Sequence, residues 1–302
     1  MASLKHIRQR IRSIQSTKQI MRAMQLVSGS KFKRAQSRLL QSRQMMGFLD
    51  GLLQRLLAAT AGPPGRGPST TLRHPLMAAR ERVPSALLIV TSDTGLAGSY
   101  NANLIQLAEG ELRRDAAQRT QVSFVGKRGH RYFAKRGDAA KDAILDLAGR
   151  PDITRIDAIG KMLMDRFLAG EIGSVRVLYA KFVSAAVSKP TVAQWLPIQL
   201  NSLSRPPSTG QPANEPADAY IFEPSPERVF ADLLPRWAIA TFRLLLLEAF
   251  ASEHGARMIA MKNATDNAED LLGSLTRQRN KIRQATITRE LSEIVGTVEA
   301  LK

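Results

Sequence analysis

The segment TSDTGLAGSYNAN, at residues 91–103, has the composition and the position of a ligand-binding loop. It follows the apolar run ALLIV and precedes the helix-like segment LIQLAEGELRR. A loop between a buried strand and a helix holds a phosphate in many α/β proteins, because the free amide groups at the helix N-terminus point at the anion. Position alone would therefore suggest a nucleotide site at Ser92–Asn103.

The residues within this loop argue against that chemistry. The sequence has no GxxxxGK[ST] motif, and Gly95 with Gly98 gives only GxxG rather than GxGxxG. The carboxylate of Asp93 would repel a phosphate. We therefore interpret Ser92–Asn103 as a tight turn between a strand and a helix, and GKRGH (residues 126–130) as a surface turn.

Other catalytic and metal chemistries find no support in the residue spacing. His6, His74, His130 and His254 are scattered and form no metal-ligand pattern. A GxSxG motif is absent, and the chain has no cysteine, which excludes disulfides and thiol catalysis. We expect no catalytic residue, no metal and no cofactor.

Composition restricts the class of partner. The chain has 302 residues, a formal net charge of +18 and a pI of about 10.9, which points to nucleic acid, an anionic membrane surface or an acidic protein. The most apolar stretch, residues 238–250, is interrupted by Arg243 and Glu248, so we expect no membrane span. The basic, amphipathic start of the chain resembles an organelle-targeting peptide, but the pattern continues without a small-residue cleavage region, so we interpret it as mature structure.

The first sixty residues carry a helical pattern with strong positive charge. Apolar residues recur at spacings of three and four, and a shifted stripe is expected to continue the pattern. The first stripe comprises Leu4, Ile7, Ile11 and Ile14, and the second comprises Ile20, Met24 and Val27. The segment contains twelve lysines and arginines and only one acid, Asp50. One helix of this length would extend roughly 85 Å, which is too long for a compact core.

The last eighty residues show the same periodicity. One stripe comprises Met258, Met261, Thr265, Ala268, Leu272, Leu275, Arg279 and Ile282, and a second comprises Ile287, Leu291, Ile294, Val298 and Leu301. A seven-residue repeat over this length indicates a coiled coil. If the intervening chain returns near its starting point, the two terminal helices pair antiparallel.

Between the terminal helices the sequence alternates strands with helices. Strands are expected at 86–91, 122–125, 175–183 and 191–196, and helices at 102–114 and 154–168, the latter with Asp152 near its N-cap. We predict an α/β protein in which a long antiparallel two-helix coiled coil carries an inserted Rossmann-like α/β domain. The expected parts are an N-terminal helix (1–60), a linker (61–84), the central domain (85–200), a Pro-rich loop (201–222) and a C-terminal helix (223–302).

The charged surfaces leave alternatives open at this point. The basic N-terminal helix could bind nucleic acid, but its apolar seam needs a helical partner and it has only two aromatic residues, Phe32 and Phe48, for base stacking. A solvated or protein-facing surface explains it equally well. The cluster RQRNKIRQ (277–284) is either a charged helix face or a site of ion pairing with a partner. The apolar end after Glu293 is costly to expose and suggests an apolar socket.

Several separated stretches resemble the gamma subunit of F-type ATP synthases. The N-terminal IRQRIRSIQSTKQIMRAMQLVSGSKFKRAQ is similar to the family's first coiled-coil helix, and SDTGLAGSYNANL to its SDRGLCGxxN loop. KFVSAAVSKPTVAQWLPI resembles the end of the central domain. ASEHGARMIAMKNATDNAEDLL and NKIRQATITRELSEIVGTVEAL resemble the C-terminal helix. Thr94 and Ala97 depart from the arginine and cysteine that are usual in the loop.

The resemblance implies a rotating shaft rather than an enzyme. The paired helices would turn inside a ring of three alpha and three beta subunits, and the α/β domain would bind epsilon and the membrane c ring. The complex would lie peripherally at the cytoplasmic face of a bacterial inner membrane, with neither nucleic acid nor a second copy of this chain as partner. By the resemblance, Arg22, Met24, Arg283, Gln284, Thr288 and Glu290 would contact the ring, and Ile294, Val295, Val298 and Leu301 would form an apolar bearing tip.

Overall fold

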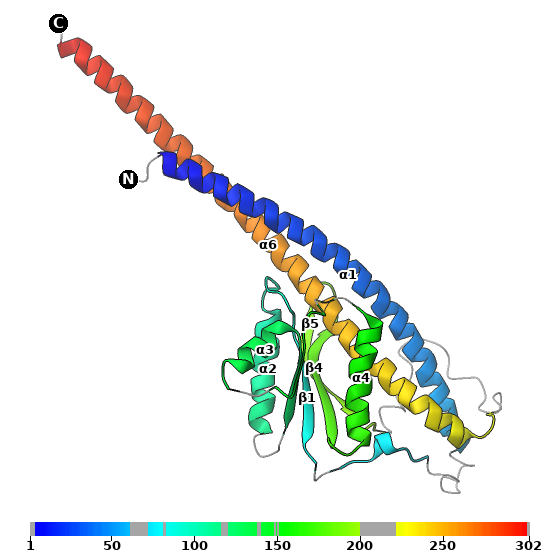
Figure 1. Cartoon of the computed structure of the whole chain (residues 1–302). Helices are drawn as coiled ribbons and strands as arrows, with labels where there is room; N and C mark the ends of the chain where they lie inside the picture. The colour runs from blue at the N-terminus through cyan, green and yellow to red at the C-terminus, as the bar shows by residue number, and fades with distance from the viewer. Residues whose placement is uncertain are drawn as a thin grey trace. The chain divides into compact units, whose positions relative to one another are not determined.

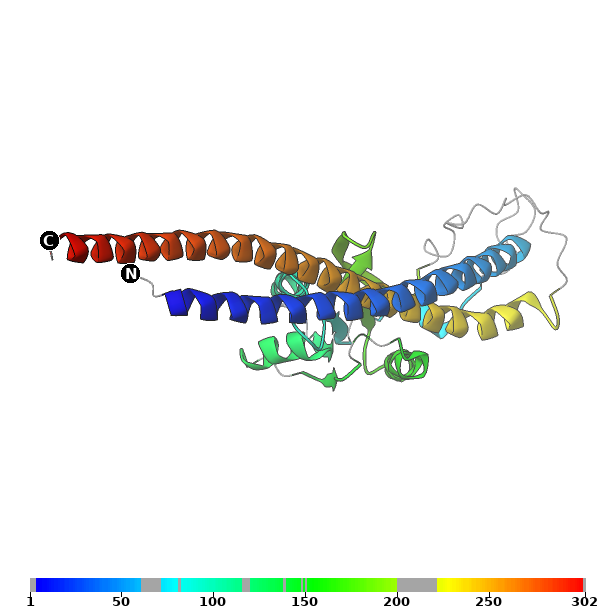
Figure 2. The ribbon, with the colours of Figure 1, turned by 90° about the horizontal axis from the view of Figure 1, so that it is seen from above.

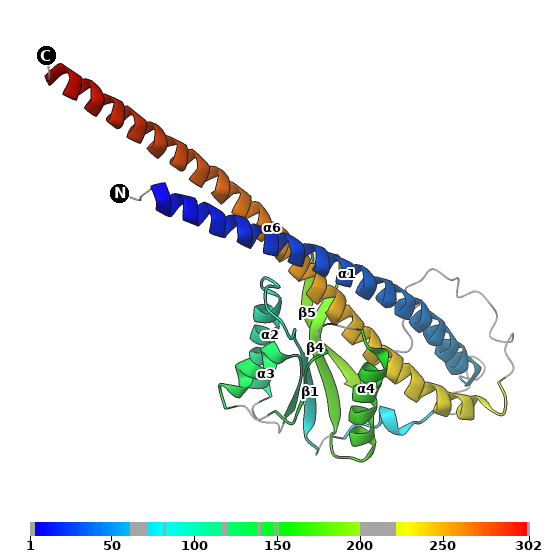
Figure 3. The same cartoon turned by 45° about the horizontal axis from the view of Figure 1, so that its top comes forward.

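The computed structural model describes residues 4–60, 72–80, 83–115, 120–137, 140–147, 149, 151–199 and 222–300. The chain divides into two compact units, Ser30–Ala256 and a second unit that joins Met1–Gly29 with Arg257–Lys302. Figure 1 labels the elements, and Figures 2 and 3 show them from two further directions.

Two helices dominate both ends of the chain. Helix α1 spans Leu4–Thr60 and helix α6 spans Pro226–Ala300, which are 57 and 75 residues without interruption. This confirms the prediction of two long terminal helices. Each helix contributes to both units, so each is long because it packs in two successive environments rather than because its own hydrogen bonds favour such length.

The Ser30–Ala256 unit is built on a five-stranded sheet of order β3-β2-β1-β4-β5. Strands β1 to β4 are parallel, and the edge strand β5 is antiparallel to β4. The strands are β1 (Ser85–Val90), β2 (Gln121–Val125), β3 (Asp142–Ile144), β4 (Ser174–Phe182) and β5 (Ser188–Leu196). The parallel order with connecting helices is the Rossmann-like arrangement that the sequence predicted.

Helices cover both faces of this sheet (Figure 1). On one face lie α2 (Tyr100–Arg114) and α3 (Lys127–Ala134); on the other lie α4 (Ile153–Leu168) and the parts of α1 and α6 that belong to this unit. Every residue of β1 is therefore buried, with Ala86, Leu88 and Val90 in one core and Leu87 and Ile89 in the other. Burial on both sides explains why this strand is a continuous apolar run.

Three elements were not predicted from the sequence. GKRGH begins helix α3 rather than forming only a surface turn, so that interpretation is wrong for residues 127–130. Gly126 makes the entry possible, because its φ of 97° and its closeness to the Thr91 carbonyl leave no room for a Cβ. Strand β3 has three residues, as does the 3₁₀ helix η1 (Pro75–Met77), and both are too short for a periodic signal.

In the other unit the two helices pair antiparallel. Lys18 Nζ lies 3.1 Å from a Glu269 carboxylate oxygen, and Ile7 and Ile11 pack against Leu275. On α6 the predicted stripe is confirmed, since Met261, Thr265, Ala268 and Leu275 are buried. The unit is thus a two-helix coiled coil whose partners run in opposite directions.

The predicted shift of the α1 stripe is wrong. Ile20 and Val27 are 58% and 55% exposed, and the inward positions are taken by Lys18, Met21 and Ser28 instead. The seam keeps its register from Ile7 onward, at spacings of three and four, and passes through polar residues. A lysine can occupy such a position because its aliphatic stem packs while its ammonium group reaches Glu269.

A proline inside α6 is compensated by a histidine from the segment before β1. Pro235 has no N–H, so it cannot donate to the Ala231 carbonyl one turn earlier. The His74 ring hydrogen-bonds to that carbonyl, and its Nδ1 accepts from the Leu76 amide at 3.1 Å. Burial lowers the pKa of His74 below 6.5, although the Ala231 carbonyl opposes this shift. The fold therefore favours the neutral imidazole.

We expect His74→Asn to cost less stability as the pH falls. The folded state holds His74 neutral more strongly than the unfolded state does. The stabilising contribution of His74 is therefore present above about pH 6.5 and is lost as the pH falls through the lowered pKa of the folded state. Urea midpoints of the wild type and the variant should converge between about pH 7.5 and 5. His6→Asn, at an exposed position of α1, is the control. A midpoint difference for His74→Asn that stays constant over this range would contradict the assignment.

Candidate functional site

The Ser92–Asn103 loop is closed by its own side chains. The Asn101 carboxamide oxygen accepts the Ser92 amide at 3.0 Å, and the Ser92 hydroxyl donates to the Thr94 carbonyl at 2.6 Å. A carboxylate oxygen of Asp93 accepts the Lys127 amide at 3.0 Å, at the start of α3. The loop is a tight turn, as predicted, and Asp93 satisfies an amide group that a bound phosphate would need.

Helix α6 fills the crevice where α/β proteins usually bind a ligand. In a doubly wound sheet that crevice lies at the carboxyl ends of the strands where the order reverses, here between β1 and β4. The Tyr100 hydroxyl, at the start of α2, donates to the Ala249 carbonyl at 3.2 Å, and the Ser252 hydroxyl donates to the Ala180 carbonyl at 3.0 Å. Gly255 lies against the Ala185 carbonyl, which leaves no space for a side chain.

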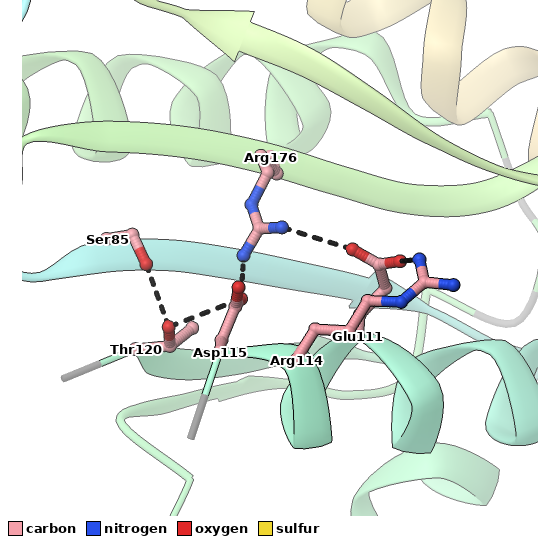
Figure 4. A network of polar contacts seen from close by, with 6 residues as sticks. All are labelled: Ser85, Glu111, Arg114, Asp115, Thr120 and Arg176. Atoms are coloured by element: carbon pink, nitrogen blue, oxygen red, sulfur yellow. Dashed lines mark hydrogen bonds and ion pairs between the residues drawn. The ribbon is translucent and has the colours of Figure 1, made fainter. Parts of the chain in front are cut away.

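A second polar cluster lies at the other end of the strands from the Ser92–Asn103 loop (Figure 4). Arg176 of β4 pairs with Glu111 at 3.1 Å and with Asp115, and the Thr120 hydroxyl lies 2.8 Å from that of Ser85. Ser85 begins β1 and Arg176 is near the start of β4, so the cluster lies at the amino ends of the strands. This network ties the C-terminus of α2 to the sheet and neutralises the charge of Arg176.

The described residues form no metal site built from the usual protein ligands. Among them, no group of three or more His, Cys, Asp or Glu side chains could hold an ion. His254 is buried and its Nε2 lies 2.9 Å from the Gly149 carbonyl, so it packs α6 against the loop before α4. No helix in the described ranges is long and apolar enough to cross a membrane.

The residues expected to contact a ring lie in two separate places on the coiled coil. Arg22 is exposed and Met24 is half-buried on α1, whereas Arg283, Gln284, Thr288 and Glu290 are all exposed on α6. The Lys18–Glu269 pair places Met24 opposite about residue 263. The two groups are therefore separated by about 20 residues, or roughly 30 Å along the helix axis.

The expected bearing tip is an uncovered apolar surface. Ile294, Val295 and Val298 are 59%, 60% and 56% exposed, and Leu301 lies outside the described residues. By the same register, α6 beyond about residue 283 extends past Leu4, the first described residue of α1. Within the described chain, the second apolar stripe of α6 therefore has no helical partner.

Comparison with known proteins gives the family. The model of the ATP synthase family matches residues 3–301. An ATP synthase gamma chain of Symbiobacterium thermophilum is 40% identical over 99% of this chain and 98% of its own length, and one of Anaeromyxobacter dehalogenans is 40% identical over 100% of both. The chain belongs to the ATP synthase gamma-chain family. The resemblance stated from sequence motifs is thus confirmed.

Solved structures give the same fold at lower identity. A chain in the central stalk and c ring structure of Tetrahymena thermophila mitochondrial ATP synthase superposes with a TM-score of 0.56, at 22% identity, covering 81% of this chain and 99% of that one. A chain in the Euglena gracilis OSCP, F1 and c-ring structure superposes with a TM-score of 0.62, at 17% identity, covering 99% of this chain and 94% of that one.

The chain also has a basic groove that the sequence analysis did not single out. Lys31, Arg34 and Arg38 of α1 line a cavity of about 580 Å³ with Gly149, Pro151 and Asp152. Arg38 donates to the Pro151 carbonyl, and Arg34 to the Ser30 hydroxyl at 3.2 Å. The excess of cations in residues 1–60 was the available signal, but only the fold shows which of them share a groove.

We expect Tyr100→Phe to lower the stability of the sheet unit by about 0.5–1.5 kcal/mol, because it removes one buried hydrogen bond to α6. Tyr132→Phe is the matched control, since its hydroxyl bonds Glu109 at a partly exposed position. The urea midpoint of each variant measures the effect. An equal loss for both variants would show that the Tyr100 contact does not secure α6 at the strand ends.

Proposed function

We propose that this chain is the rotor that couples ion flow through a membrane c ring to ATP synthesis and hydrolysis at the beta subunits. It takes part in no bond-making step itself. The observation that carries this proposal is the pair of long, uninterrupted helices, one of which ends in an apolar stripe without a partner in the described chain. A shaft that transmits torque must be stiff, and its end must turn in a surface that covers apolar side chains.

The mechanism is one of differential interaction. Identical beta sites can hold different nucleotide affinities only if the shaft presents a different surface to each of them. Two antiparallel helices of unequal length have no rotational symmetry, so each beta subunit of the ring meets different side chains. Turning the shaft then carries each site through the same series of affinities.

Positive charge supports contact with acidic segments of the ring. The N-terminal sixty residues have twelve cations and one acid, and Arg22, Lys31, Arg34 and Arg38 lie along α1. Exposed ion pairs contribute only about 0–1 kcal/mol each, which suits contacts that must break at every step. We place Arg22 and Met24 near the acidic lever segments of the beta subunits. We place Arg283, Gln284, Thr288 and Glu290 in a coupling region nearer the C-terminal end of α6.

The remaining partners follow from the same proposal. The α/β domain binds epsilon and the c ring, and the assembly lies at the cytoplasmic face of the bacterial inner membrane. Three alpha and three beta subunits surround the coiled coil. The direct test is co-purification: the tagged chain should recover alpha, beta and epsilon with ATPase activity. Recovery of the chain with nucleic acid and without these subunits would contradict the proposal.

We expect changes in the tip to weaken assembly of the complex and changes in the coupling region to lower its ATPase rate. Deleting Val298–Lys302 removes apolar contacts, each contributing about 1.5–3 kcal/mol when buried, so the complex should lose subunits more readily and still turn over. Replacing Arg283 and Gln284 with alanine should leave the complex assembled and lower its ATPase rate. Subunit retention and ATPase rate are measured for both variants.

The matched control is Arg289→Ala, which removes a pair with Glu293 at 3.7 Å on the same exposed helix. It should alter neither quantity by much. If the tip deletion abolished turnover in a fully assembled complex while the double alanine variant turned over normally, the roles assigned along α6 would be wrong.

A further inference from the structure

The basic groove lies between α1 and the segment that leads from β3 to α4, within the Ser30–Ala256 unit (Figure 1). Its α1 wall carries Lys31, Arg34 and Arg38, which are three and four residues apart and therefore share one face of the helix. Together they extend over about 10 Å along the helix axis. Like charges one helical turn apart repel each other, and a negative group in the groove would relieve that repulsion.

The described residues supply no carboxylate partner for these three cations. Arg34 donates to the Ser30 hydroxyl at 3.2 Å, and Arg38 donates to the Pro151 carbonyl. Both acceptors are neutral, so both guanidinium groups keep their full charge. Lys31 forms neither a hydrogen bond nor an ion pair with any residue of the described ranges. The positive charge of the groove is therefore available to a ligand.

The opposite wall is held in place from behind. The Gly149 carbonyl lies 2.9 Å from Nε2 of the buried His254, and the Pro151 carbonyl accepts from Arg38. Gly149 has a φ of 62°, and a Cβ there would lie 2.7 Å from the His254 ring, so a side chain does not fit. The groove is thus preformed, and its volume of about 580 Å³ is typical of a small-molecule site.

Negative charge around the groove is limited. Asp152 is the one carboxylate among the lining residues, and it caps α4 by accepting the Arg155 amide at 3.3 Å. The N-terminus of α4 is therefore already satisfied, and the binding capacity comes from the cations of α1. The Glu253 carboxylate lies behind Gly149, is 2% exposed and does not line the groove. Three cations against one carboxylate leave the lining with a net positive charge.

We propose that the basic groove binds a chain of phosphoryl groups, as carried by free polyphosphate or by a nucleoside triphosphate. Guanidinium groups bind phosphoryl oxygens through paired hydrogen bonds, and a lysine adds a compact charge. A single phosphate reaches one or two of the cations, whereas a chain of phosphoryl groups can contact Lys31, Arg34 and Arg38 together. The groove is separate from the Ser92–Asn103 loop and from the crevice that α6 fills, and the inference goes beyond the rotor function.

The test uses the full-length chain and isothermal titration calorimetry at low salt. Tripolyphosphate should bind saturably and about tenfold more tightly than inorganic phosphate, which is the gain expected for one more charge-assisted contact. ATP is the second source of the same chemistry. Tighter binding of ATP than of tripolyphosphate would identify a nucleotide as the ligand, and equal or weaker binding would identify free polyphosphate. Hexaglutamate, which is also highly charged but has no phosphoryl group, should bind about tenfold more weakly than tripolyphosphate.

Charge variants locate the site. Arg34→Ala and Arg38→Ala should each weaken tripolyphosphate binding by about tenfold. Arg34 is exposed and bonds only to Ser30, so its variant should fold even if the loss of the Arg38 contact proves disruptive. Lys33→Ala is the matched control, because Lys33 is an exposed cation of the same turn that does not line the groove. It lowers the net charge equally and should change the affinity by less than about twofold.

Two further variants test the groove itself rather than the charge of α1. Gly149→Ala should weaken binding at unchanged net charge, since the added Cβ displaces the wall. Gly137→Ala is its control, because Gly137 also has a positive φ, of 86°, but faces open space away from the groove. Asp152→Asn should strengthen binding by about threefold, because it removes the lining carboxylate while asparagine still caps α4.

Equal losses for Lys33→Ala and Arg34→Ala would overturn the proposal, because the chain would then bind anions through its overall charge. An affinity that neither Gly149→Ala nor Asp152→Asn alters would do the same. Hexaglutamate binding as tightly as tripolyphosphate would also overturn it and would assign the groove to an acidic protein segment. None of these results bears on the rotor function, which is tested by recovery of the ATP synthase subunits.

Discussion

The structure depends on one constraint, which is that α1 and α6 must each bury a single stripe against the other along their paired length. In one unit Ile7 and Ile11 meet Leu275, and in the other Phe32, Ala35 and Leu39 meet Leu247 and Ala251. The α1 stripe keeps spacings of three and four throughout, whether its members are large, small or polar. That regularity keeps both helices free of breaks, and a shaft without breaks can transmit a turning force.

The same constraint explains why the α/β domain holds its ligand crevice closed. The part of α6 that pairs with α1 also lies across the carboxyl ends of the parallel strands, where Tyr100 and Ser252 bond it to the sheet. An α/β fold of this type ordinarily leaves that place open for a nucleotide. Here the helix that serves the coiled coil occupies it, and the loop Ser92–Asn103 has become a structural turn. The domain is therefore suited to hold the helix pair and not to bind a phosphate at the carboxyl ends of β1 and β4.

Local patterns were sufficient to predict the long helices, four of the five strands and the α6 stripe, because apolar periodicity is a property of neighbours in sequence. They failed at Ile20 and Val27, where apolar residues lie outside while Lys18 and Ser28 lie inside. Tertiary pairing outweighed the residue types there. The boundaries of the five parts expected from the sequence remain a prediction. So do the ring contacts of Arg22, Met24, Arg283, Gln284, Thr288 and Glu290 and the role of the apolar tip. A surface that serves a partner shows only its exposure.

The features that sequence reasoning missed all join distant residues. His74 compensates Pro235 across more than half of the chain, and Arg43 meets Glu248 between two helices far apart in sequence. No spacing rule links such pairs. The basic groove had a partial signal in the charge of the first sixty residues, but its other lining residues are Gly149, Pro151 and Asp152, more than a hundred positions further along the chain. Long-range pairing of this kind becomes visible only when the fold is known.

The most direct test of the central claim is a single-molecule rotation measurement. Because the chain has no cysteine, a single Lys189→Cys change on the exposed part of β5 provides a unique point for attaching a bead to the α/β domain. The alpha and beta ring is assembled around this variant and immobilised, and ATP is added. A rotor inside the proposed ring predicts turning in one direction, with three main pauses per turn, one for each of the three beta subunits proposed for that ring. Sustained ATP hydrolysis by an assembled complex whose bead does not turn would contradict the account.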